Sequence, residues 1–163
     1  MPRIVFVLGL CGSGKSTRAR KLNADGLINF DEKVTGRPVH PDLAQWPRSA
    51  YRELLEAIVL GQDCVVTEIY FYRPEAQQHI IQELRAIRPD VVIEWECFDA
   101  ADVDLANYNC KHDPDRTTDG IVANLNQNER TVECLRVGTF IVPPGARLLR
   151  TERRQRACRL TLG

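Results

Sequence analysis

Short runs of apolar residues, several of them rich in β-branched side chains, alternate along the chain with segments of helical periodicity. Each run has the length and composition of a buried strand, and the first one leads directly into a glycine-rich segment. The runs predict strands at residues 3–8, 27–30, 63–69 and 91–98, with further strand residues within 139–142 and 147–149.

Between these runs, apolar residues spaced three and four positions apart predict helices. Pro74 suits the first turn of one helix, Gly61 the end of another, and Asp119 the N-terminal cap of the last. Residues 35–47 contain three prolines and predict a loop. The predicted helices cover about residues 15–22, 50–58, 74–87, 102–109 and 121–135.

Strands that alternate with helices predict a parallel sheet with helices on both faces. A chain of 163 residues without an internal repeat or interior linker is expected to form one domain. We therefore predict a single α/β domain over residues 1–163 with a sheet of about five strands. Right-handed crossovers then place the loop after the first strand at the carboxyl edge of the sheet.

Composition narrows the class of protein. Apolar residues make up 44% and charged residues 27% of the chain, the balance of a soluble globular protein. No apolar run approaches the roughly 18 residues of a membrane span, and no charged and apolar leader precedes the first strand. Six cysteines form no C-x-x-C pair and three histidines are scattered, so we expect reduced cysteines and no zinc site. A cytoplasmic protein without a membrane partner is expected, in the host cytoplasm if the gene is phage-borne.

Basic residues gather near the C-terminus, although the net charge of the whole chain is zero. Six arginines fall within residues 147–159 and are opposed there only by Glu152, which leaves the rest of the chain net acidic. This arginine-rich tail, residues 147–163, has the charge to contact the phosphates of a nucleic acid. Solvation, or pairing with acids of the same chain, is an equally open interpretation.

The stretch "GLCGSGKST", residues 9–17, matches the pattern G-x-x-x-x-G-K-[ST] between a predicted strand and a predicted helix. Its glycines let successive backbone N–H groups point inward around an anion, and the helix adds its positive N-terminal end. Lys15 can bridge the outer phosphates of a nucleotide, and the Ser16 hydroxyl is the expected Mg²⁺ ligand. The predicted nucleotide-binding residues are Gly9, Cys11, Gly12, Ser13, Gly14, Lys15, Ser16 and Thr17.

Other classes of nucleotide-binding protein fit the sequence less well. GTPase-type switches usually carry an N-K-x-D element, which is absent, and motor ATPases usually carry a pair of acids at a strand end. Here the third predicted strand ends in a lone Glu68 after Thr67, and the chain is too short for the additional modules of a motor. These absences favour a small kinase.

The loop, an aspartate directly after the second strand, and the segment "CFDAADVDLANYNC", residues 97–110, resemble the P-loop kinases of the polynucleotide kinase type. The resemblance covers about residues 4–135 and places the chain in the P-loop NTPase superfamily. It implies a fold like that of the nucleoside monophosphate kinases, with a small lid at about residues 110–120. It also implies that the protein uses ATP and Mg²⁺.

The resemblance further implies roles for individual residues. Asp31 matches the general base that accepts the proton of the acceptor hydroxyl. Arg116 in the lid is the expected cation for the γ-phosphate, with Lys111 and Arg130 as alternatives. Lys15, Asp31 and Arg116 are therefore the predicted catalytic residues.

The sequence matches the family pattern at three positions and departs from it at one. Phe98, Asp99 and Asn109 occupy family positions, whereas Tyr108 stands where relatives carry an arginine. Three acids lie near Arg116 in the lid and are expected to pair with it when the lid is open: Asp113, Asp115 and Asp119.

Three features at or just after the third predicted strand each have two possible interpretations. Glu68 can hold a Mg²⁺-bound water or contact the acceptor, or it can cap the loop that follows it. Arg73 can contact the acceptor or be solvated. The aromatic residues 70–72 can stack on a base or belong to the core.

The phosphate acceptor is open between three possibilities. The first is a hydroxyl of a nucleic acid, at a 5′ end or on a hydroxymethylated base in DNA, which the arginine-rich tail and the resemblance support. The second is a small molecule such as a nucleoside, sugar or other metabolite, which suits the acidic body of the chain. The third is a nucleotide-binding module without catalysis. We expect the first of these, with ATP as the donor.

Overall fold

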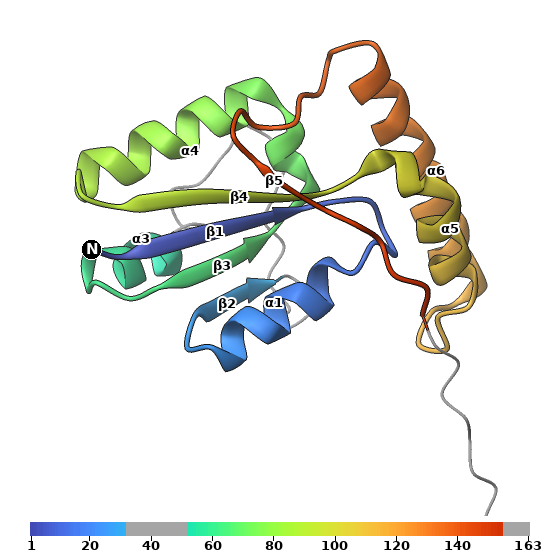
Figure 1. Ribbon diagram of the computed structural model, residues 1–163, viewed down its shortest axis with the longest axis horizontal. Coiled ribbons are helices and arrows are strands. Elements are labelled where there is room, and N and C mark those ends of the chain that lie inside the picture. Colours follow the sequence, from blue (N-terminus) through green and yellow to red (C-terminus); the bar gives the residue numbers. More distant parts are fainter. Residues whose placement is uncertain (32–51, 155–163) are drawn as a thin grey trace, which may run out of the picture.

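The computed structural model describes residues 1–31 and 52–154, and of Asp31 and Arg52 it describes the backbone. The loop expected at residues 35–47 lies outside the described residues. Within the described part, five parallel strands form one sheet in the order β2-β3-β1-β4-β5, which confirms the predicted α/β fold (Figure 1). The strands are β1 (Arg3–Leu8), β2 (Ile28–Asp31), β3 (Cys64–Thr67), β4 (Val92–Phe98) and β5 (Arg147–Leu149).

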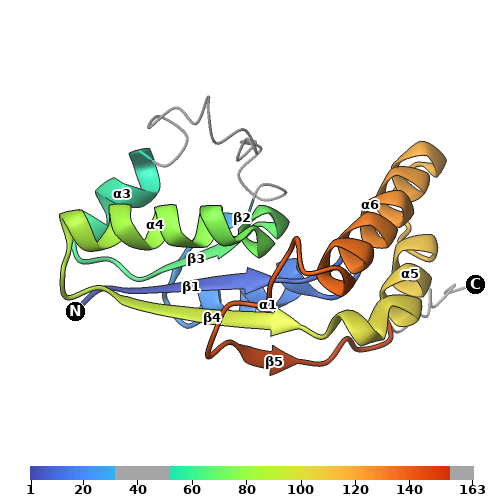
Figure 2. The same cartoon turned by 90° about the horizontal axis from the view of Figure 1, so that it is seen from above.

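Helices connect the strands and cover both faces of the sheet. The α-helices are α1 (Lys15–Ala24), α3 (Arg52–Val59), α4 (Pro74–Ile87), α5 (Val103–Lys111) and α6 (Thr118–Arg136), and two short 3₁₀ helices are η1 (Ile69–Tyr72) and η2 (Ala100–Asp102). Helices α3 and α4 pack on one face and α1 on the other (Figure 2). Helices α5 and α6 lie beyond the carboxyl ends of the strands. None of the described helices has the length and apolar character needed to cross a bilayer.

The expectation of strand residues within 139–142 is wrong. This segment runs beside η1, where the Ile141 N–H donates to the Tyr72 carbonyl at 2.8 Å. Pro143 and Pro144 follow it and carry no N–H for a sheet ladder, so pairing begins only at β5. Phe140 of this segment is instead partly buried by packing against the core cluster, while Val142 is exposed.

The start of one helix and the end of one strand also differ from expectation. Helix α6 begins three residues earlier than predicted, and its cap is Thr117, whose hydroxyl accepts from the Gly120 N–H at 3.2 Å. The prediction that Asp119 caps this helix is therefore wrong. Asp119 lies in the first turn, where its charge still complements the positive helix end. The strand predicted over 63–69 ends at Thr67, because Glu68 caps η1.

Strand β1 is the centre of the core. Its alternate side chains face opposite sides of the sheet, and both sides are fully buried, as expected for the middle of a parallel sheet. Phe6 stacks on Trp95 with ring centroids 4.4 Å apart, while Val5 and Val7 pack against α1. The aromatic residues 70–72 are buried on the same side of the sheet as Phe6, which confirms their interpretation as core.

The described cysteines are free thiols. Burial raises the pKa of both Cys64 and Cys97 to about 12, so neither forms the reactive thiolate near neutral pH. Both lie in strands of the sheet, where they act as small apolar side chains.

Candidate functional site

The glycine-rich loop lies at the carboxyl edge of the sheet, between β1 and α1, as predicted. Its backbone turns through two left-handed residues, Gly12 at φ 82° and Gly14 at φ 110°, which glycine adopts without strain. The Ser13 N–H donates to the Leu10 carbonyl at 3.1 Å and closes the turn. A Cβ on Gly9 would lie 2.5 Å from the Ser13 hydroxyl oxygen, so the loop is tightly wound over its own first residue.

Gly12 is required for a second reason, which is the close approach of α5. A Cβ at this position would lie 2.2 Å from the Ala106 carbonyl oxygen and 2.9 Å from the Cys110 sulfur. Helix α5 therefore packs directly against the loop backbone. The loop is supported by an element that follows β4, some hundred residues later in the chain.

Replacing Gly12 by alanine is expected to lower the free energy of unfolding by about 2–4 kcal/mol, because left-handed strain and a steric clash act together. Gly138 offers a matched control: its φ is 79°, but a Cβ there would meet nothing within 4 Å. Gly138→Ala should lose only the strain contribution, about 1–2 kcal/mol. Chemical denaturation of both variants measures the difference, and equal losses would mean that α5 does not press on the loop.

Lys15 begins α1 and turns back over the loop. Its ammonium group donates to the carbonyls of Gly9 at 2.7 Å and Leu10 at 2.9 Å. The charge is therefore held against the backbone of the glycine-rich loop, and its role toward a nucleotide remains a prediction. Ser16 and Thr17 occupy the same first turn of α1 and line the adjoining cleft.

The loop opens into a cleft of about 1110 Å³ at the carboxyl edge of the sheet. Among its described lining residues, Lys and Arg outnumber Asp and Glu by eight to four, which suits a polyphosphate anion. Besides the loop and α1, the walls come from the end of β3, from α5 and α6 with the turn between them, and from β5 with the segment after it. The polar residues from these other walls are Thr67, Glu68, Asn109, Asp113, Asp115, Arg116, Asn124, Gln127, Arg147, Arg150, Glu152 and Arg154.

Arg116, predicted in the lid, does line this cleft. Its guanidinium donates to the Asp113 carboxylate at 2.9 Å, and Arg154 pairs with the same carboxylate at 2.8 Å. Burial alone would raise the pKa of Asp113, but hydrogen bonds from Arg116 and Arg154 hold this pKa below its ordinary value. The expected pairing of Arg116 with a lid acid is thus present for Asp113. The alternatives Lys111 and Arg130 are exposed and do not line the cleft.

Asp31 ends β2 at the same edge of the sheet. Its backbone is in register with Thr67 of β3, which lines the cleft. The chain therefore reaches the edge of the cleft at Asp31, two strands away from the glycine-rich loop. Its role as the general base remains a prediction.

Of the two interpretations expected for Glu68, the structure shows the capping one, because Glu68 caps η1. Its carboxylate accepts from the Tyr70 N–H at 3.3 Å at the start of η1, while the residue also lines the cleft. Arg73 is exposed at the start of α4, with its guanidinium 5.3 Å from the centre of the Tyr70 ring and 5.9 Å from that of Phe140. These rings hold the guanidinium in place by cation–π contacts.

The residues that carried the family resemblance surround the loop. Phe98 packs beneath it, since a Cβ on Gly9 would come within 2.9 Å of the Phe98 Cβ. Asp99 caps η2 by accepting from the Ala101 N–H at 2.9 Å. Tyr108, which replaces the expected arginine, stacks on the His112 ring at 4.0 Å and beneath the Arg153 guanidinium at 4.4 Å. A cation from the C-terminal segment thus covers the tyrosine.

Three of the four described tail arginines pair with acids of the same chain, and the fourth, Arg153, lies over the Tyr108 ring. Arg147 lies 3.5 Å from Glu96, Arg150 binds Asp102 at 2.6 Å, and Arg154 pairs with Asp113. The intramolecular alternative for this segment is therefore observed for residues 147–154.

Sequence reasoning missed three residues that build the site. Arg18 of α1 and the buried Glu96 of β4 form a two-pronged ion pair, with both distances 2.7 Å, that fixes α1 to the sheet. Asn128 of α6 is fully buried and hydrogen-bonds both backbone groups of Cys11. No local pattern marks these residues, because their partners lie far away in the chain.

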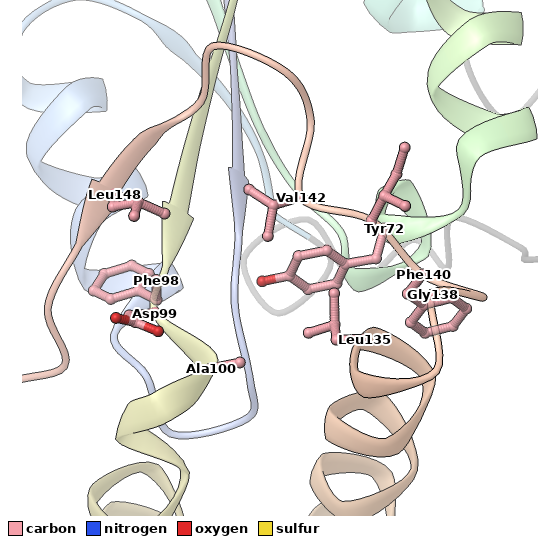
Figure 3. A pocket seen from close by; sticks show the side chains of 10 residues that line it. Tyr72, Phe98, Asp99, Ala100, Leu135, Gly138, Phe140, Val142 and Leu148 are labelled. Carbon is pink, nitrogen blue, oxygen red and sulfur yellow. The ribbon is translucent and has the colours of Figure 1, made fainter.

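A second, smaller cavity of about 340 Å³ lies beside the end of β4 (Figure 3). Apolar side chains dominate its walls, and the Tyr72 hydroxyl points into it. Burial raises the pKa of Tyr72, so the hydroxyl stays neutral. Asp99 is the one charged residue among the described walls, and the absence of a cation there makes this cavity unsuited to phosphate. The larger cleft is therefore the better candidate for a phosphate site.

No family model matches the chain, and no curated protein matches it in sequence. Solved structures do share its fold. A gluconokinase from Sinorhizobium meliloti 1021 has a TM-score of 0.58 at 15% identity, covering 94% of this chain and 85% of that chain. The protein APE1195 has a TM-score of 0.53 at 15% identity, with coverages of 93% and 85%. A protein from Chloroflexus aurantiacus j-10-fl, named as a candidate kinase, has a TM-score of 0.52 at 17% identity, with coverages of 91% and 84%.

The strand order, the glycine-rich loop and these likenesses define the fold as that of the P-loop kinases. The predicted fold class is thereby confirmed. The narrower expectation of a polynucleotide kinase type finds no support, since none of these three structures bears that name.

Proposed function

We propose that the protein is an ATP- and Mg²⁺-dependent kinase that phosphorylates a hydroxyl group of a small molecule. The observation that carries the proposal is the glycine-rich loop with Lys15, which opens into a cleft where Lys and Arg outnumber Asp and Glu. This cleft lies at the carboxyl edge of a parallel sheet, where ligands of open α/β folds bind.

The residues present fit a nucleoside triphosphate with its metal ion. The loop backbone from Gly12 onward and the amino end of α1 would hold the phosphates, and Lys15 would neutralise their outer charges. The Ser16 hydroxyl would be the protein ligand of Mg²⁺. ATP supplies the phosphoryl group when bound.

Two residues at the cleft have proposed roles in the transfer. Asp31 would accept the proton that the acceptor hydroxyl loses and would orient its oxygen. Arg116, released from Asp113 as the lid closes, would neutralise charge on the transferred group. Both roles follow from the family resemblance, and the position of each residue at the cleft is compatible with them.

A small acceptor is preferred to a nucleic acid for two reasons. The structure with the TM-score of 0.58 is named a gluconokinase, a kinase whose name denotes a small-molecule acceptor. In addition, three of the six arginines that favoured nucleic acid binding, Arg147, Arg150 and Arg154, pair with acids of the same chain. A nucleic acid hydroxyl remains the second candidate because of the residues that resemble polynucleotide kinases.

A screen for γ-phosphate transfer tests the proposal. Labelled ATP with Mg²⁺ would be offered with sugars, sugar acids, nucleosides, single-stranded DNA and hydroxymethylated duplex DNA. We expect label on a small molecule, with a rate that changes little with added salt. Transfer to DNA that falls steeply with salt, at a log–log slope of roughly −0.9 per phosphate contact, would favour the nucleic acid alternative. ATP binding without transfer to any acceptor would indicate a binding module.

A further inference from the structure

Asn128 is a fully buried polar side chain in the middle of α6. Its Oδ1 accepts from the Cys11 N–H at 2.7 Å, and its Nδ2 donates to the Cys11 carbonyl at 3.0 Å. The same nitrogen donates to Asn107 Oδ1 of α5 at 2.8 Å. One carboxamide thus pairs with both backbone groups of a loop residue 117 positions away in sequence, and Asn107 fixes which end of the amide faces which group.

Asn109 of α5 binds the backbone of the next loop residue, Gly12. Its Nδ2 donates to the Gly12 carbonyl at 3.0 Å and to the Glu152 carbonyl at 2.9 Å. Its Oδ1 accepts from the Arg154 N–H at 2.9 Å. Two asparagines on two helices therefore hold consecutive loop residues, and Asn109 also joins the loop to the segment after β5.

A carboxamide is suited to this position because it presents a donor and an acceptor side by side. The loop around Cys11 cannot use a helix or sheet ladder for its own N–H and carbonyl groups. Buried backbone groups left without partners are destabilising, so a loop that lost this pairing would move toward other conformations in which water satisfies them.

We propose that Asn128 is a positioning residue for nucleotide binding. Together with Asn109, it fixes the Cys11–Gly12 segment in its anion-binding conformation before the nucleotide arrives, and it links the loop to the α5–α6 pair that carries Arg116. The inference rests on the proposed function, because it concerns the same phosphate loop. If the loop is already ordered in the free protein, binding does not have to supply the free energy of ordering it, and the affinity for the nucleotide is higher.

The proposal predicts that loss of the Asn128 amide weakens nucleotide binding by the folded protein. Asn128→Leu keeps a similar volume and removes all three hydrogen bonds, while Asn128→Asp keeps the shape and loses the two donated bonds. Each is expected to raise the Kd for Mg·ATP, measured by calorimetry well below the melting temperature, by about tenfold or more. Asn126→Leu is the matched control on the exposed face of the same helix and should leave the Kd within twofold.

The readout separates positioning from simple stabilisation. A residue that only stabilises the fold would lower the melting temperature and leave the Kd of the folded molecules unchanged. Such a result for Asn128→Leu or Asn128→Asp would overturn the inference. Should neither variant fold, Asn107→Ala, at a half-buried position, removes only the bond that orients the Asn128 amide. It should raise the Kd about threefold, and an unchanged Kd there would overturn the inference equally.

Failure of the inference can be told apart from failure of the proposed function. If the unmodified protein binds no Mg·ATP, the proposed function fails. If it binds Mg·ATP and the folded variants bind it equally well, only the role of Asn128 is wrong.

Discussion

Lys15→Ala is expected to reduce phosphate transfer by roughly 10³-fold and to weaken ATP binding strongly. The ammonium group of Lys15 lies within the loop, 2.7 Å from the Gly9 carbonyl and 2.9 Å from the Leu10 carbonyl. No other described cation is held by the loop in this way, so its removal leaves the outer phosphates without their nearest positive charge. Steady-state kinetics and ATP titration, with circular dichroism to verify folding, measure the effect.

Lys111→Ala is the matched control for this experiment. Lys111 is exposed at the end of α5 and does not line the cleft, so its loss should change neither affinity nor rate by more than about twofold. A folded Lys15→Ala variant that binds ATP normally and transfers phosphate at the original rate would show that the glycine-rich loop is not the phosphate site.

Asp31→Asn is expected to lower the rate of transfer by about 10²–10⁴-fold while the Kd for ATP stays within twofold. The amide cannot accept the proton of the acceptor hydroxyl, but it preserves the size of the side chain. The position of Asp31 at the end of β2, beside Thr67, is at the edge of the cleft and two strands away from the phosphate loop. Turnover with the best acceptor of the screen and ATP titration separate the two effects.

Asp25→Asn supplies the comparison for this variant. Asp25 is exposed and precedes β2, at the other end of the strand from Asp31, so the same chemical change should have no effect on turnover there. Full turnover by Asp31→Asn with the fold and ATP binding intact would exclude Asp31 as the general base.

The sheet and the position of the glycine-rich loop could be predicted because their signals are local. The run at residues 3–8 reads as a strand by its composition, and the loop pattern follows it within a few positions. The apolar residues at 139–142 carry the same local signal, but the segment packs beside Tyr72 without joining the sheet, and only part of its apolar surface is buried. Composition indicates that a segment is buried and does not indicate what buries it.

The α6 cap shows a similar limit at smaller scale. Thr117 and Asp119 both belong to residue types that cap helices, and they lie only two positions apart, so residue type alone does not decide between them. The structure selects Thr117 because the preceding turn, in which the Arg116 N–H donates to the Asp113 carbonyl, leads into the helix at that point.

The supports of the site could not be predicted. Asn109 and Asn128 bind loop residues 97 and 117 positions away, and Arg18 binds Glu96 across 78 positions. Each is an ordinary polar residue in its local segment, and its partner is set only once elements far apart in the sequence fold together. Sequence patterns therefore identified the groups expected to touch the nucleotide, and the structure was needed to find the groups that hold them.

The two ends of the described chain lie at opposite ends of the sheet, and this has a practical consequence (Figure 2). Arg3 starts β1 at the amino edge, whereas Arg154 is bonded to Asn109 beside the cleft. An affinity tag or a surface-attachment handle fused before Met1 would leave the cleft open to solutes. A handle inserted directly after Arg154 would emerge next to the cleft and would obstruct it, so biosensor or pull-down formats should use the amino end.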